Sequence, residues 1–309
     1  MEIKIIRSGM LTTVQDRGRR GHRASGVPLG GAMDAFALRV ANLLVGNPDG
    51  AAALEFALVG PTLEFSADTI VALGGGEFEG MPVWTPRAVR AGERLELTAC
   101  RRGCRGYLAI AGGIDVPPVL GSRSTYLRAG FGGLNGRVLR EGDVLAASTV
   151  TRRVNESEHW RIDERILPPY SAHPTVRVLR GAQAAEFGDT WLTADFKVSP
   201  QSDRMGLRLT GPALRRATAA DMVSMAVAPG TVQAPPDGQP IVLMAEAQTI
   251  GGYPQLAHVI EVDLPLLAQV RPGDTVRFAE TTLTEAHRLR AAREHTLAML
   301  HEGLAQKFH

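Results

Sequence analysis

The sequence predicts a mainly β protein built from two domains. At 309 residues the chain is longer than one hydrophobic core usually supports, so two domains are the natural expectation. Apolar or alternating runs of strand length recur at short intervals, and each ends at glycine, proline or an acidic turn. These runs cover residues 2–6, 69–73, 94–98, 107–111, 175–179, 241–245, 259–262 and 275–278.

A tight-turn sequence precedes a strand-like run at three places. These are Ala91-Gly92-Glu93, Glu141-Gly142-Asp143 and Pro272-Gly273-Asp274. Their repetition suggests two related, barrel-like units.

Only two helices are predicted. Residues 32–45 place apolar side chains at helical spacing and stop at Gly46, a favourable position for ending a helix. Near the C-terminus, Thr282-x-x-Glu285 forms a capping box that opens an amphipathic helix. Between the domains, residues 151–173 carry two adjacent prolines without clear periodicity, which is typical of a linker. We therefore expect a β-rich N-terminal domain at 1–165 and a C-terminal domain with the terminal helix at 166–309.

The composition is that of an ordinary soluble protein. The hydrophobic share is 44%, the charged share is 21% and the net charge is +2, with dispersed basic residues that do not suggest nucleic acid. No apolar run reaches the roughly 20 residues of a membrane span, and the start lacks the apolar region of a signal peptide, so a cytoplasmic location without membrane contact is expected. Cys100 and Cys104 are the only cysteines and are expected to be reduced.

The sequence lacks the motifs of several enzyme classes. There is no Gly-x-x-x-x-Gly-Lys-Ser/Thr phosphate loop, and Gly74-Gly75-Gly76 is not followed by the glycine pattern of a dinucleotide site. His287, His295 and His301 are spaced too unevenly to share a metal face, so no metal site is predicted in this chain. None of the three lysines lies in a biotin-attachment context, so no biotin is expected on this chain.

Polar clusters on loops are the positive candidates, because rigid β scaffolds usually carry their chemistry there. In the first cluster, Arg17 and the Gly30-Gly31 pair precede Asp34 at the start of a predicted helix, where backbone N–H groups can bind an anion. Asp34 can equally be the acidic residue of a first helical turn.

Two further clusters contain arginine. Arg123 lies between two hydroxyls, Ser122 and Ser124, as in a carboxylate or phosphate clamp, although an ordinary strand-end arginine is an equal alternative. Asp203 and Arg204 are adjacent before a glycine, where a turn can aim a carboxylate base and an electrophilic partner the same way. A structural salt bridge in the turn is equally possible.

The most informative segment is Gln248-Thr249-Ile250-Gly251-Gly252-Tyr253-Pro254, which follows the apolar run 241–245. Two glycines leave backbone N–H groups uncovered beside hydrogen-bonding side chains, as in a loop that approaches a ligand. The alternative is a β-hairpin that needs two unhindered residues.

Together these segments resemble one family, the 5-oxoprolinase C subunit proteins, also called allophanate hydrolase subunit 2 or biotin-dependent carboxyltransferase family proteins. The resemblance runs almost end to end. It is carried by the motifs Leu11-Thr12-Thr13-Val14-Gln15-Asp16, Gly31-Ala32-Met33-Asp34, Ala41-Asn42-Leu43-Leu44-Val45-Gly46-Asn47, Leu54-Glu55, Gly112-Gly113-Ile114, Leu120-Gly121-Ser122-Arg123-Ser124-Thr125, Ser202-Asp203-Arg204-Met205-Gly206 and Gln248 to Pro254.

The resemblance implies two cyclophilin-like β-barrel domains and one part of an ATP-dependent enzyme that opens 5-oxoproline to L-glutamate. It implies two partners, a B subunit of related fold and an A subunit, with ATP as co-substrate of the complex. One alternative is a carboxyltransferase module, of the urea carboxylase or allophanate hydrolase type, acting with a biotinylated partner. Another is a non-catalytic antagonist of a histidine-kinase inhibitor.

The same resemblance suggests roles for individual residues. Asp203 would accept a proton, Arg204 or Arg123 would stabilise developing negative charge, and Gln248 would hold the substrate. The remaining expected substrate- or nucleotide-binding residues are Asp34, Ser124, Thr249, Gly251, Gly252 and Tyr253. Glu246-Ala247, Ile250 and Met225 depart from the family pattern and leave the substrate open.

Overall fold

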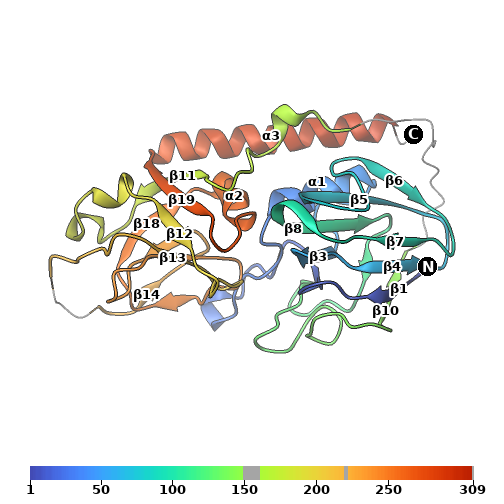
Figure 1. Ribbon diagram of the computed structural model, residues 1–309, viewed down its shortest axis with the longest axis horizontal. Helices are drawn as coiled ribbons and strands as arrows, with labels where there is room; N and C mark the ends of the chain where they lie inside the picture. The colour runs from blue at the N-terminus through green and yellow to red at the C-terminus, as the bar shows by residue number, and fades with distance from the viewer. Residues whose placement is uncertain (149–160, 219–221, 308–309) are drawn as a thin grey trace. The chain divides into compact units, whose positions relative to one another are not determined.

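The computed structural model describes residues 1–148, 161–218 and 222–307, which are mainly β with three α-helices (Figure 1). The chain divides into two compact units. Unit 1 consists of Met1–Arg19, Gly30–Leu167 and His295–His309, and unit 2 consists of Arg20–Leu29 and Pro168–Glu294. Residues 151–160 of the predicted linker lie outside the described residues.

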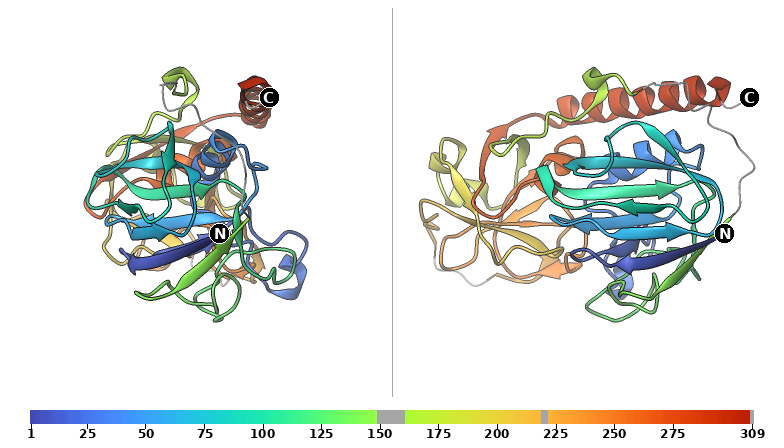
Figure 2. Two further views of the ribbon diagram at one scale, coloured as in Figure 1. Left: turned by 90° about the vertical axis from the view of Figure 1, so that its right-hand side faces the viewer. Right: turned by 45° about the vertical axis from the view of Figure 1, so that its right-hand side comes forward.

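Unit 1 contains two five-stranded antiparallel sheets, and the right-hand view of Figure 2 shows their strands, coloured blue to green, stacked above one another. The first sheet has the order β7 (Arg94–Glu96), β4 (Thr62–Phe65), β1 (Glu2–Arg7), β10 (Val144–Ala147) and β9 (Ile114–Asp115). The second has the order β2 (Thr13–Gln15), β3 (Ala53–Ala57), β8 (Cys100–Ile110), β5 (Thr69–Phe78) and β6 (Pro86–Val89).

One hydrophobic core lies between these sheets. Ile3 and Leu63 of the first sheet and Leu54 and Leu108 of the second belong to the same buried cluster. The expected barrel is not closed in the described part of unit 1, where the strands remain two sheets. The edge strands β2, β6, β7 and β9 are at most four residues long, so they offer little backbone to continue a ladder from one sheet to the other.

Helix α1 (Ala35–Leu44) is the helix predicted over 32–45. The side chain of Asp34 accepts a hydrogen bond from the backbone N–H of Ala37 and thereby caps the helix. Gly46, with φ of 74°, follows the C-terminal end in the left-handed conformation that glycine tolerates.

Unit 2 is built around a closed barrel, seen in yellow to red in Figure 1. Its strand order is β11 (Thr175–Arg180), β18 (Gln255–Val259), β15 (Thr231–Gln233), β16 (Ile241–Leu243), β13 (Gly206–Thr210), β12 (Phe196–Val198) and β19 (Thr275–Glu280). A separate pair, β14 (Met225–Ala226) and β17 (Ile250–Gly251), lies outside the barrel ladder.

The predicted strand at 259–262 is wrong beyond its first residue. The strand β18 ends at Val259, and the chain continues as a 3-10 turn η5 (Glu261–Asp263) and the short helix α2 (Leu264–Ala268). Pro265 favours a helical start there, and the Asp263 carboxylate accepts hydrogen bonds from the backbone and guanidinium of Arg177. The other 3-10 turns are η1 (Arg23–Ser25), η2 (Glu164–Ile166), η3 (Ala184–Glu186) and η4 (Thr190–Leu192).

The three predicted tight turns share one hydrogen-bond pattern. In each, the backbone N–H of the arginine three residues earlier donates to the acidic side chain: Arg90 to Glu93, Arg140 to Asp143 and Arg271 to Asp274. The central glycines Gly92, Gly142 and Gly273 have φ of 77°, 87° and 97°, which side chains of L-residues disfavour. The turns are therefore built by local chemistry that the sequence alone displays.

The terminal helix α3 (Leu283–Lys307) begins as its capping box predicts, because the Thr282 hydroxyl accepts the backbone N–H of Glu285. Leu297 and Leu304 are buried, whereas His287, His295 and His301 are not, as expected for surface histidines. Among the helices of the described residues, none is both long and apolar enough to cross a membrane. Cys100 and Cys104 lie buried in β8 as free thiols.

Candidate functional site

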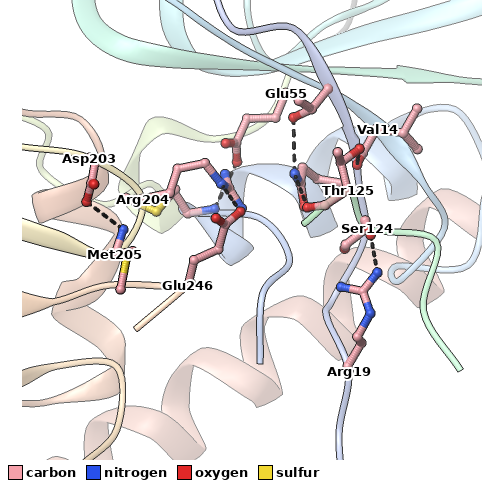
Figure 3. A network of polar contacts seen from close by, with 12 residues as sticks. Val14, Arg19, Glu55, Ser124, Thr125, Asp203, Arg204, Met205 and Glu246 are labelled. Carbon is pink, nitrogen blue, oxygen red and sulfur yellow. Dashed lines mark hydrogen bonds and ion pairs between the residues drawn. The ribbon is translucent and has the colours of Figure 1, made fainter. Parts of the chain in front are cut away.

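Two loops of unit 2 bring the predicted catalytic residues together. In the first, Asp203 Oδ1 accepts the backbone N–H groups of Met205 and Gly206, at 2.8 and 3.0 Å (Figure 3). Asp203 is exposed, and its second oxygen makes no hydrogen bond to a described residue. The turn is thus fixed by one carboxylate oxygen while the other stays available for chemistry.

Arg204 and Glu246 join this turn to the second loop. Arg204 Nε lies 2.6 Å from Glu246 Oε1, with side chains only 12% and 5% exposed, and the backbone N–H of Glu246 donates to the Arg204 carbonyl (Figure 3). Glu246 is therefore the buried counter-charge of Arg204. Removing either member would leave the other charge buried without this partner.

The segment from Gln248 onward is not a local hairpin. Its strand β17 pairs with β14 in the register Met225↔Gly251 and Ala226↔Ile250, and the Val227 N–H donates to the Thr249 carbonyl at 3.1 Å. Met225 is thus the strand partner of Gly251. The side chains of Ile250 and Tyr253 are exposed.

Gly251 permits a close approach, and neither glycine of the pair forms a left-handed turn. Neither Gly251 nor Gly252 adopts a left-handed φ. A Cβ on Gly251 would lie 2.5 Å from Gln233 Nε2, whereas one on Gly252 would lie 3.4 Å from Ser224 Oγ, an ordinary contact. Only Gly251 is therefore required by its surroundings, and Gln233 is the group it approaches.

Gln233 lies at the end of β15 and is 1% exposed. Its Oε1 is 3.5 Å from Gln248 Nε2, a weak hydrogen bond, and its Nε2 has no hydrogen-bond partner among the described residues. A buried polar atom without a partner is costly, and native proteins rarely retain one without a reason. Gln248, Gly251 and Gln233 thus form one contiguous polar site.

In unit 1, Asp16 organises the loop that carries Arg123. The Asp16 carboxylate, which is buried, accepts hydrogen bonds from the hydroxyls of Ser122 and Ser124 and from the backbone N–H groups of Gly18 and Arg123. The bonds to Ser122 and Arg123 connect residues more than 100 positions apart in the sequence. The loop 122–125 is therefore held rigidly by a residue that the sequence-based site did not include.

The two predicted residues of this loop, Arg123 and Ser124, differ in how far their side chains are exposed. The hydroxyl of Ser124 is fully buried and hydrogen-bonded to Asp16, and the Ser124 carbonyl accepts a hydrogen bond from Arg19 (Figure 3). The Arg19 guanidinium also lies 4.7 Å from the centre of the Phe131 ring. The Arg123 side chain is 42% exposed and contacts Asp115 at 3.5 Å. Of the two, Arg123 is the side chain placed to meet a ligand.

Asp34 is fully buried as the N-cap of α1, so its carboxylate occupies the helix N-terminus where an anion was expected. Its backbone N–H donates to the Tyr107 hydroxyl, and Glu55 accepts the N–H of Met33. Burial raises the pKa of Tyr107 well above its ordinary value, and the nearby Glu55 and Asp34 carboxylates add to that shift. Arg17 pairs with Asp49 at 3.4 Å.

One pattern in the sequence points to Gln15 and Gln233, which were not among the predicted site residues. Thr13-Val14-Gln15 and Thr231-Val232-Gln233 repeat the same three letters, form β2 and β15, and are fully buried in both units. Both glutamines retain an amide atom without a hydrogen-bond partner among the described residues. In the same part of the chain, no group of three or more His, Cys, Asp or Glu side chains is arranged to hold a metal ion.

Comparison with known proteins identifies the family of this chain. Residues 25–280 match the carboxyltransferase domain family, subdomains A and B. The chain belongs to this family. Within it, the chain is 44% identical to the C subunit of 5-oxoprolinase from Escherichia coli, over 93% of this chain and 94% of that protein. It is 39% identical to the protein of the same name from Haemophilus influenzae, over 91% and 92%.

A solved carboxyltransferase-family structure supports the same relationship. The crystal structure of the K. lactis urea amidolyase superposes with a TM-score of 0.90 at 30% identity, covering 97% of this chain. The chain spans only 20% of that much longer protein. The chain is thus a homologue of the 5-oxoprolinase C subunit, and its carboxyltransferase fold is shared with urea amidolyase.

Proposed function

We propose that this protein is one component of an ATP-dependent 5-oxoprolinase complex that opens 5-oxoproline to L-glutamate. The 44% identity to the C subunit of a 5-oxoprolinase, extending over nearly the full length of both chains, carries this proposal. The chain would act with a B subunit of related fold and with an A subunit. ATP is then the co-substrate of the complex, with no biotin on this chain.

The chemistry requires activation of an unreactive amide. Resonance stabilises the lactam carbonyl, and transfer of a phosphoryl group from ATP to the carbonyl oxygen makes that oxygen a leaving group. Water then adds to the carbonyl carbon, and the ring C–N bond breaks as the nitrogen takes up a proton, which leaves an acyl phosphate. A second water hydrolyses this acyl phosphate to the carboxylate of L-glutamate and inorganic phosphate. In unit 2, Asp203 would accept a proton from water through its available oxygen, and Arg204, oriented by Glu246, would stabilise negative charge.

Substrate contacts are proposed for the loop beside these residues. Gln248, Thr249 and Tyr253 would contribute side chains, while Gly251 and Gly252 would present backbone amides. In unit 1, the exposed Arg123 guanidinium is proposed to bind substrate or nucleotide oxygens. Ser124 and Asp34 would contribute indirectly, since their polar atoms hold the loop and the helix end.

The test is ATP-dependent glutamate formation from 5-oxoproline by the complex reconstituted from this chain and its two partners. Asp203→Asn keeps an oxygen that can accept the turn N–H groups but removes the base, so kcat should fall roughly 100-fold or more. Asp237→Asn is the matched control, because Asp237 is an exposed aspartate that accepts a backbone N–H in another turn of unit 2. Equal activity of the two variants would remove Asp203 from the mechanism.

The structural similarity to urea amidolyase favours a second candidate, a carboxyltransferase that acts on urea or a related amide with a biotinylated partner. Carboxybiotin-dependent consumption of urea, without any turnover of 5-oxoproline, would support it. Tight binding to the B subunit or to a kinase inhibitor, without turnover of either substrate, would instead favour a regulatory role.

We also propose that both units are cyclophilin-like domains of common origin. The shared turn pattern, which occurs in unit 1 at Gly92 and Gly142 and in unit 2 at Gly273, supports this relationship. The repeated Thr-Val-Gln strands support it independently.

A further inference from the structure

Arg23 is an arginine of unit 2 without an acidic partner in the described residues. It belongs to the segment Arg20–Leu29, which groups with unit 2, and its Nη2 donates to the Val227 carbonyl. Its Nη1 is buried and has no hydrogen-bond partner in that part of the chain. Other partly buried arginines of unit 2 are paired, as Arg204 is with Glu246 and Arg216 with Glu186. Among the described residues, Arg23 therefore combines a charge that no carboxylate pairs with and a donor without an acceptor.

Val227 connects Arg23 to the loop that contains Thr249 and Gly251. The Val227 carbonyl accepts from Arg23, while its N–H donates to the Thr249 carbonyl in the loop described above. Gly251 packs closely against Gln233 and Val227. A Cβ added to Gly251 would lie 2.5 Å from Gln233 Nε2 and 3.3 Å from Val227 Cγ1. Gln233 Nε2 thus lies against Gly251, and Arg23 is linked to the same loop through Val227.

We propose that Arg23 and Gln233 bind the carboxylate of an anionic amide substrate at the Gln248–Gly252 loop. This assignment rests on the proposed function, because 5-oxoproline carries such a carboxylate and urea does not. A guanidinium and an amide N–H supply one donor for each carboxylate oxygen, and the positive charge matches the ligand's negative charge. Gly251 has no side chain to press against Gln233 Nε2, which an added Cβ would approach to 2.5 Å.

The experiment measures steady-state kinetics of the reconstituted complex with Arg23→Gln, Arg23→Lys and Gln233→Glu. Loss of a charge-assisted hydrogen bond predicts that Arg23→Gln raises KM for 5-oxoproline roughly 10- to 100-fold, with kcat changed only a few-fold. Arg23→Lys keeps the charge and should lie between wild type and Arg23→Gln. Gln233→Glu places a carboxylate against the substrate and should raise KM further. Arg215→Gln is the matched control, since Arg215 is an exposed arginine of the same unit.

Inhibition separates carboxylate binding from a purely structural role. Cyclopentanecarboxylate should inhibit the wild-type complex competitively, whereas cyclopentanecarboxamide should not. The Arg23→Gln variant should lose this preference for the carboxylate while keeping the melting temperature of the wild type. An unchanged KM and preference in Arg23→Gln would overturn the assignment. The assignment would also be overturned if a variant lost inhibition by inorganic phosphate while its KM for 5-oxoproline stayed unchanged. The donors would then bind a phosphate group and not the substrate carboxylate.

Failure of the proposed function has a different signature. If the wild-type complex forms no glutamate from 5-oxoproline, the proposed activity is wrong, and calorimetry with cyclopentanecarboxylate tests the site by itself. Binding to wild type that is lost in Arg23→Gln would support the carboxylate site. Equal binding by both proteins, or binding by neither, would overturn it.

Discussion

Replacing Glu246 by glutamine should destabilise unit 2 and displace the candidate site. The substitution preserves size and an acceptor oxygen but leaves the Arg204 guanidinium buried beside a neutral amide, where the two side chains of the native pair are 12% and 5% exposed. Removing one partner of a buried ion pair costs roughly 3–5 kcal/mol, and the retained hydrogen bond offsets roughly 1 kcal/mol. The expected loss in the free energy of unfolding is therefore about 2–4 kcal/mol.

A double-mutant cycle in urea unfolding measures this coupling. Glu246→Leu combined with Arg204→Met should recover most of the stability, because well-packed apolar side chains often replace a buried ion pair without loss. Asp195→Asn is the control, since Asp195 pairs with Arg277 at the surface, where the two side chains are 50% and 61% exposed, and should change stability far less. A Glu246→Gln variant as stable as Asp195→Asn, or a coupling energy below about 0.5 kcal/mol, would refute this account.

Three further predictions concern Gly251, Asp16 and His258. Gly251→Ala should destabilise by roughly 1–3 kcal/mol through overpacking against Gln233, whereas Gly252→Ala should be tolerated, and equal urea midpoints would contradict this. Asp16→Asn should cost roughly 2–4 kcal/mol, because an amide NH₂ would face groups that now donate to the carboxylate; an unchanged midpoint would argue against Asp16 as the centre of its loop. Burial lowers the pKa of His258 below its ordinary 6.5, so its contribution to stability is present above pH 6.5 and is lost as pH falls through the folded-state pKa. His258→Gln should therefore reduce the difference in urea midpoint between about pH 7.5 and about pH 5.5.

The parts of the fold that local chemistry determines could be predicted from the sequence. The three tight turns, the capped terminal helix and the helix at 32–45 each have a glycine, hydroxyl or acidic side chain that defines a boundary. The strand β3 escaped prediction although all five of its residues are buried, because Glu55 interrupts its apolar pattern. Its burial depends on pairing with β2 and β8, which no local pattern reveals.

The same distinction explains what was predicted of the candidate site. The Asp203 turn and the Gln248–Gly252 loop are visible as motifs, because glycine and polar residues cluster there. The partner of Arg204 is Glu246, 42 positions away, and Gln233 meets Gly251 only after β15 enters the barrel. Such contacts are set by strand register across the barrel, so the sequence indicated which loops matter but not which atoms they oppose.

The repeated Thr-Val-Gln strands show how equal sequences acquire different chemistry from their surroundings. In unit 1, Gln15 Nε2 donates to the Thr125 carbonyl, which fixes the amide orientation because two carbonyl oxygens repel, and Oε1 is the atom left without a partner among the described residues. In unit 2, Gln233 Oε1 faces the Gln248 amide and Nε2 is left without one. The first unit thus buries a free acceptor and the second a free donor. An anionic oxygen can satisfy only the donor, so this asymmetry favours unit 2 for the substrate carboxylate even though both units carry the same strand.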